Sequence, residues 1–129
     1  MGITTRFALR AGTIAVGAAV LAATVATSAS ASPNARYIRY GDTGYAVKCV
    51  QWAINDWLDA DLSDSWHAHL ILDVDGVFGE RTLAMVKQYQ GVALLDDDGI
   101  VGPETGNYMW TGRLYKKHPE CYSYIPTKV

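Results

Sequence analysis

Apolar residues recur at helical spacing in three segments of the chain. The first begins at Tyr45, and its apolar positions repeat at i, i+3, i+7, i+10 and i+11, which predicts a helix with one buried face. The expected stripe is Val47, Val50, Ile54, Trp57 and Leu58. The second helix is expected from about Glu80 to Gln90, with a stripe of Met85, Val86 and Tyr89 above Phe78 and Thr82. The third is expected from Pro103 to about Thr111, with Met109 facing inward.

The segments between these helices lack a clear period. Residues 59–65 are acidic and are expected to form a loop. Gly91 and Gly112 are the expected ends of the second and third helices, since glycine is common just past a helix end. Residues 113–129 show no regular pattern and are expected to form an irregular tail. Trp52 lies off the first stripe, so it is either partly exposed or covered by this tail, and we favour the covered position.

A short sequence unit occurs twice in front of predicted helices. Residues 75–82 and 98–105 both read D-G-x-x-G-x-x-T, and the second copy begins 23 residues after the first. A weaker third copy at residues 40–47 keeps both glycines but has lost the leading Asp and the trailing Thr. Such self-similarity indicates a domain built from repeated turn-helix units.

The residue types of the unit explain its expected shape. Asp-Gly favours a turn, because the carboxylate accepts hydrogen bonds from nearby backbone N–H groups and glycine tolerates positive φ. The apolar pairs that follow, Val77-Phe78 and Ile100-Val101, are expected to point inward. The second glycine precedes a helix whose first turn carries Glu80 or Glu104, where the helix dipole favours negative charge.

The first 31 residues have the features of a secretory signal peptide. Arg6 and Arg10 supply positive charge, residues 11–26 are uncharged and apolar, and Ala29-Ser30-Ala31 is a cleavage site of the A-x-A type. A membrane span is the alternative, but the apolar run is shorter than the roughly 18 to 20 residues that a span needs. We therefore expect a secreted protein of the extracellular space or cell wall, with no membrane attachment after cleavage and a polar linker at residues 32–36.

The remaining residues carry nine basic and thirteen acidic side chains, a formal net charge of −4 without a basic run. This composition argues against nucleic-acid binding. The length suits one small domain, which we expect to be a monomer.

Cys49 and Cys121 are the only two cysteines. An even count in an exported chain favours a disulfide, and this one would tie the tail to the first helix. Two free thiols are the alternative. His67-Ala68-His69 is the one metal-like pattern, but it has no evident third ligand. The Asp-Gly loops lack the first and last ligands of an EF-hand, so no metal or cofactor is expected.

The ordered signature residues resemble the bacterial peptidoglycan-binding domain type 1 family. In the first block they are Arg39, Gly41, Asp42, Gly44, Val47, Val50 and Gln51. In the second they are Asp75, Gly76, Phe78, Gly79, Thr82, Val86, Tyr89 and Gln90. In the third they are Asp98, Gly99, Val101, Gly102, Pro103 and Thr105. The resemblance implies a mainly α, three-helix bundle at residues 37–112 that binds peptidoglycan, usually as an accessory to a cell-wall hydrolase.

Most signature residues are expected to be structural, with the Asp side chains capping turns and Gln51 and Gln90 bonding backbone across the repeat. Residues 59–72, Gly106 and the tail at residues 113–129 depart from the family pattern. The candidate ligand contacts are Arg39, Tyr40, Asp42, Arg81, Tyr89 and Asp98.

The function expected from these features is non-catalytic binding of peptidoglycan. The alternative is a secreted protein that uses the same fold to bind or inhibit a protein partner. A small cell-wall hydrolase with a carboxylate pair is the third and least favoured reading.

Overall fold

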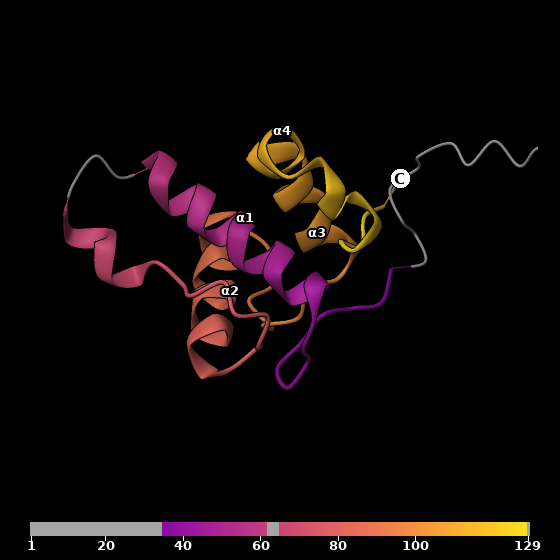
Figure 1. Ribbon diagram of the computed structural model, residues 1–129, viewed down its shortest axis with the longest axis horizontal. Helices are drawn as coiled ribbons and strands as arrows, with labels where there is room; N and C mark the ends of the chain where they lie inside the picture. Colours follow the sequence, from indigo (N-terminus) through magenta and orange to yellow (C-terminus); the bar gives the residue numbers. More distant parts are fainter. Residues whose placement is uncertain (1–34, 62–64, 129) are drawn as a thin grey trace, which may run out of the picture.

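The computed structural model describes residues 35–61 and 65–128, so the expected signal peptide and most of the linker lie outside the described residues. Three helices share one core (Figure 1): α1 (Tyr45–Asp61), α2 (Glu80–Val92) and α3 (Pro103–Met109). Shorter helical segments complete the chain: η1 (Ser65–Leu70), the π-type turn η2 (Trp110–Leu114), α4 (Tyr115–Lys117) and η3 (Pro119–Ser123). Within this part of the chain, no helix is both long and apolar enough to cross a membrane. The mainly α architecture is confirmed.

The hydrophobic core is formed by the predicted stripes. Of the predicted α1 stripe, Val47, Val50, Ile54 and Leu58 are at most 2% exposed, whereas Trp57 is only partly buried. The predicted second stripe is buried throughout, since Phe78, Thr82, Met85, Val86 and Tyr89 are each at most 5% exposed. Of each apolar pair in the repeat only the second member is buried: Phe78 is 1% exposed, whereas Val77 is 49% exposed. Burying such large apolar side chains contributes about 1.5–3 kcal/mol each to folding.

Two isolated antiparallel bridges join the N-terminal segment to the second and third turn units, and the described residues contain no longer strand. Thr43 bridges Val77, and Ile38 bridges Val101. The first turn and the second are joined further by a hydrogen bond of 2.9 Å from the N–H of Phe78 to the carbonyl of Asp42. The N-terminal segment therefore holds both later units.

Two predicted helix ends were wrong. Gly91 lies inside α2, which continues to Val92, and the left-handed residue that follows is Leu94, with φ of 57°. Leu94 is 93% exposed, so its side chain meets no neighbour in this conformation. Gly112 does not end the third helix but is a kink inside η2, after which the chain stays helical to Lys117. Helix α1 also runs to Asp61, into the expected acidic loop.

The tail is not irregular, because it folds back along α1 as α4 and η3. Four residues of α1 at i, i+4, i+7 and i+11 each contact one residue of the tail. The pairs are Tyr45 with Tyr124, Cys49 with Cys121, Trp52 with His118 and Asp56 with Lys117. Because these α1 positions share one face of a helix, the four contacts form a continuous clasp.

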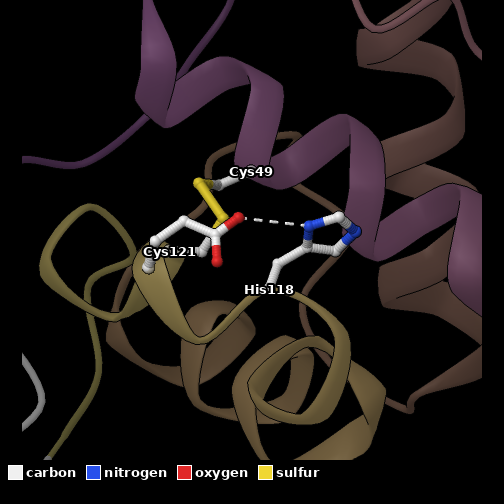
Figure 2. The surroundings of a disulfide bond; sticks show 4 residues. Cys49, His118 and Cys121 are labelled. Carbon is white, nitrogen blue, oxygen red and sulfur yellow. Dashed lines mark hydrogen bonds and ion pairs between the residues drawn. A yellow bond between two sulfur atoms is a disulfide. The ribbon is translucent and has the colours of Figure 1, made fainter.

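The predicted disulfide between Cys49 and Cys121 is confirmed, and both residues are fully buried. Figure 2 shows the His118 ring beside this bond. The His118 ring stacks on Trp52, with ring centroids 4.4 Å apart. Trp52 is accordingly covered by the tail. His118 also lies 3.3 Å from a carboxylate oxygen of Glu120.

Gly106 explains how closely the last residues approach α3. A Cβ atom placed on Gly106 would lie 1.8 Å from the carbonyl oxygen of Pro126 and 2.9 Å from the Ile125 side chain. Ile125 and Thr127 are at most 1% exposed. The small residue at position 106 therefore makes room for the C-terminal segment.

We expect Gly106→Ala to destabilise the protein by about 3 kcal/mol, because the tail backbone must move away from the new methyl group. The measurement is the free energy of unfolding in urea. Gly91→Ala is the matched control, since a Cβ at Gly91 meets no atom within 4 Å, and it should be neutral or stabilise by up to about 1 kcal/mol. Equal stabilities for the two variants would contradict the packing described.

We expect replacement of both Cys49 and Cys121 by Ala to lower the free energy of unfolding by about 4 kcal/mol, because the bond restrains a long loop in the unfolded chain. The two cysteines are 72 positions apart in sequence. Urea unfolding of the oxidised protein and the variant tests this, and a loss below about 1 kcal/mol would show that the other clasp contacts suffice.

Candidate functional site

A buried glutamine on α1 organises the second turn unit. The Gln51 side-chain amide is 1% exposed, and its nitrogen lies 2.9 Å from Asp75 Oδ1, 3.2 Å from the Val77 carbonyl and 3.3 Å from Thr82 Oγ1. Its oxygen accepts a hydrogen bond of 3.0 Å from the N–H of Gly76. Gly76 has φ of 74°, a conformation that glycine adopts without strain. One amide thus contacts Asp75, Gly76, the Val77 carbonyl and Thr82.

Gln90 on α2 repeats this arrangement in the third unit. Its amide nitrogen donates to Asp98 Oδ1, the Ile100 carbonyl and Thr105 Oγ1 at 2.9–3.1 Å. Its oxygen accepts from the N–H of Gly99 at 2.9 Å. Gln90 is fully buried. The expectation that both glutamines bond across the repeat is therefore confirmed, and the Asp and Thr of the sequence motif are parts of the same network.

The aspartates of the three units cap their own turns as expected. Asp42 accepts from the N–H of Arg39, Asp75 from that of Val77 and Asp98 from that of Ile100, each at 2.9 Å. The hydrogen bond from Gln51, and then that from the Val77 N–H, lower the pKa of Asp75 below its ordinary value of 3.8. These carboxylates are engaged in holding the turns.

The six predicted ligand residues do not meet at one place. Asp42 borders a hollow between the N-terminal segment and Tyr124, and Asp98 borders another beside Tyr37. Arg81 lines a third hollow, and its guanidinium donates to the carbonyls of His69 and Ile71. Tyr89 lies in a fourth. Arg39 and Tyr40 are exposed on the first turn.

The most apolar of these hollows is an aromatic cleft between α1, α2 and the end of α3. It has a volume of about 360 Å³ and is lined by Ala53, Trp57, Tyr89, Tyr108, Met109, Thr111, Gly112 and Arg113. The Tyr89 ring makes edge contacts with the rings of Trp57 at 5.3 Å and Tyr108 at 5.7 Å between centroids. We call this site the aromatic cleft.

The three rings have different exposures within the aromatic cleft. Tyr89 is 5% exposed and Tyr108 is 49% exposed. A tyrosine phenol is neutral near pH 7, and burial raises the pKa of the Tyr89 phenol further. The cleft therefore offers apolar ring faces, neutral hydroxyls and a single charged side chain, Arg113. Such a surface suits a ligand with both apolar faces and polar groups.

Of the residues that line the aromatic cleft, Tyr89 alone was among the predicted ligand contacts. Trp57 was assigned to the core stripe by its spacing, and Tyr108 and Arg113 lie near the predicted end of the third helix. Trp57 lies ten residues after Val47, at the edge of the predicted stripe, and this position was the one available signal that it borders a surface. Only tertiary packing brings Trp57 of α1, Tyr89 of α2 and Tyr108 of α3 together.

In the described part of the chain no group of three His, Cys, Asp or Glu side chains is placed to hold a metal ion. His69 is exposed, and the side chain of His67 lies outside the described residues.

Residues 44–109 match the family described as "Putative peptidoglycan binding domain". The match covers just over half of the chain and includes all three helices and both glutamine networks, so the protein belongs to this family. The resemblance read from the signature residues is confirmed.

Individual relatives cover only parts of the chain. The "Uncharacterized protein in bpoA1 3'region" of Kitasatospora aureofaciens is 42% identical over 64 residues, and this chain spans 47% of its length. The solved SleB N-terminal domain is 24% identical with a TM-score of 0.46, over 59% of this chain and 90% of that chain. A peptidoglycan-binding protein from Clostridioides difficile, solved with glutamine hydroxamate, is 30% identical with a TM-score of 0.45, over 61% and 42%.

We expect the free energy of unfolding to fall as the pH drops below about 4. The pKa of Asp75 is lower in the folded protein than in the unfolded chain, so the charged carboxylate stabilises the fold. This stabilisation is complete above the unfolded-state pKa of Asp75 and is lost as the pH falls through its folded-state pKa. The Asp75→Asn variant, which keeps an acceptor oxygen, should lose less stability between pH 6 and pH 3 than the unmodified protein. Urea midpoints at the two pH values measure this.

Asp97→Asn is the control for this comparison, because Asp97 is exposed and makes no hydrogen bond within residues 35–61 and 65–128. It should show the same drop as the unmodified protein. An equal drop in Asp75→Asn would count against the role given to the Gln51 hydrogen bond.

Proposed function

We propose that this protein is exported, binds cell-wall peptidoglycan in the aromatic cleft and has no catalytic activity of its own. Its membership of the peptidoglycan-binding family supports the ligand class. The observation that carries the choice of site is the aromatic cleft, where three rings from α1, α2 and α3 converge on one hollow of about 360 Å³.

The chemistry of peptidoglycan fits the aromatic cleft. Its sugars present apolar C–H faces that pack on aromatic rings, and their hydroxyl and acetamido groups need neutral hydrogen-bond partners. The exposed Tyr108 ring offers a stacking face at the rim, and the Tyr89 phenol offers a hydroxyl. The Thr111 hydroxyl donates to the carbonyl of Asn107 at 2.8 Å, so its oxygen offers an acceptor. Binding of this kind requires no charged group that acts as an acid, a base or a nucleophile.

The carboxylates of the repeat support the non-catalytic part of the proposal. Glycosidic hydrolysis needs an acid with a raised pKa beside a second carboxylate. Asp75 instead has a lowered pKa and caps a turn, and the residues that line the aromatic cleft include no carboxylate. The first unit, with Arg39, Tyr40 and Asp42, is the competing location for ligand contacts.

A protein partner is the second candidate function. Four exposed tyrosines lie near the N-terminal end of α1: Tyr37, Tyr40, Tyr45 and Tyr124, each 38–56% exposed. Tyr37 and Tyr124 line a hollow of about 240 Å³ at the junction of the N-terminal segment and the tail. Tyrosine is enriched in protein interfaces because it combines apolar area with a polar tip, so this face suits a partner such as a cell-wall hydrolase.

We expect the oxidised protein to sediment with purified insoluble peptidoglycan without clearing it. Tyr108→Ala should weaken binding at least about fivefold, the equivalent of ~1 kcal/mol, because the variant loses the stacking face, whereas Tyr108→Phe should bind nearly as well. Depletion from the supernatant measures binding, and a zymogram of the same sample detects hydrolysis. Clear zones that persist after repurification would refute the non-catalytic assignment.

The variant Tyr40→Ala separates the two possible locations of the site. It changes an exposed tyrosine of the first unit and should bind like the unmodified protein. If Tyr40→Ala loses binding while Tyr108→Ala retains it, the site belongs to the first unit. If the unmodified protein does not sediment at all, the tyrosine face near Tyr45 becomes the stronger candidate and a protein partner replaces peptidoglycan.

A further inference from the structure

Arg113 stands alone as a charged side chain on the aromatic cleft. It is exposed at the end of η2, and it is the one charged residue among those that line the cleft. Within the described residues it has no ion-pair or hydrogen-bond partner, whereas the neighbouring Lys117 is bound to Asp56 at 2.8 Å. An unpaired guanidinium beside aromatic rings is free to bind an anionic group of a ligand.

The other three hollows differ from the aromatic cleft in charge. Each is lined by at least one carboxylate: Asp42 in the first, Asp96, Asp98 and Glu104 in the second, and Asp73, Asp75 and Glu80 in the third. Residues 32–129 carry a formal net charge of −4, but the residues that line the aromatic cleft include one positive side chain and no carboxylate. Charge complementarity favours an anionic ligand there over a cationic one.

Arg113 and the two lining residues before it, Thr111 and Gly112, lie outside the matched family region, which ends at residue 109. Thr111, Gly112 and Arg113 belong to η2, where the kink at Gly112 interrupts regular helix geometry. Leu114 beside them is 1% exposed and anchors this turn in the core, and the clasp between the tail and α1 follows directly. The tail therefore builds part of the site, and does not simply cover it.

We propose that Arg113 gives the aromatic cleft its specificity by binding a carboxylate of peptidoglycan while the rings of Trp57 and Tyr108 hold the adjacent apolar part of the ligand. This inference rests on the proposed function. A planar guanidinium binds a carboxylate through two parallel N–H donors, which a neutral amide or a lysine does not reproduce. Ligand carboxylates occur on the stem peptides and, in peptide-free glycan, on the lactyl group of the sugar.

The test compares native insoluble peptidoglycan with the same material whose carboxylates have been converted to methylamides. We expect Arg113→Gln to bind native peptidoglycan roughly two- to fivefold more weakly than the unmodified protein, the upper part of the range for an exposed ion pair. Amidation should weaken the unmodified protein by the same factor and leave Arg113→Gln unchanged. Arg113→Lys should recover only part of the loss.

Lys116→Gln is the matched control, because it removes the same charge from the same segment at a residue that does not line the aromatic cleft. It should bind like the unmodified protein, and circular dichroism confirms that each variant is folded. Equal binding of Arg113→Gln and the unmodified protein would overturn the proposal, as would an equal loss for Lys116→Gln. Absence of any binding by the unmodified protein would instead refute the proposed function.

Two soluble probes locate the carboxylate. Free stem peptide and peptide-free disaccharide with a free lactyl group are titrated separately against the unmodified protein and Arg113→Gln. The probe that loses affinity in Arg113→Gln contains the bound carboxylate. If neither probe discriminates between the two proteins while both bind, the assignment of Arg113 to carboxylate recognition is wrong.

Discussion

Two buried side-chain amides determine how the three helices are placed. Gln51 on α1 binds the turn that precedes α2, and Gln90 on α2 binds the turn that precedes α3. Each helix therefore positions the start of the next. Both amides are almost fully buried, so a helix shifted by one turn would leave several polar groups without partners in the core. Such networks select one arrangement among those that hydrophobic burial alone would allow.

The tail covers the last of the three turn-helix units. No glutamine network follows α3, whose outer face would remain open after the last repeat. The segment after η2 covers it: Ile125 and Pro126 pack against Gly106, and the disulfide between Cys49 and Cys121 returns the chain to α1. Terminal units of repeat proteins commonly differ in this way, because they face solvent or a cap in place of another repeat.

The residues of the repeated motif have a structural role. The side chains of Asp75, Asp98, Gln51 and Gln90 make their hydrogen bonds within the turns. The site that we propose for the ligand lies where the units do not repeat, at the junction of Trp57, Tyr89 and Tyr108 with the η2 turn. Family membership identifies the fold and supports the proposed class of ligand. Some of the residues that line the proposed site lie beyond the matched region, which ends at residue 109.

The sequence by itself determined the features that depend on local chemistry. Helical periodicity predicted the buried stripes, the Asp-Gly and Gly spacing predicted the turns, and the cysteine count predicted the disulfide. Tertiary structure decided the rest. Gly91 stays helical because the left-handed turn falls at Leu94, and the tail becomes helical because α1 offers it a matching face. The aromatic cleft joins residues from 57 to 113, and no local pattern shows that such distant residues meet, since their contact arises only when the helices pack.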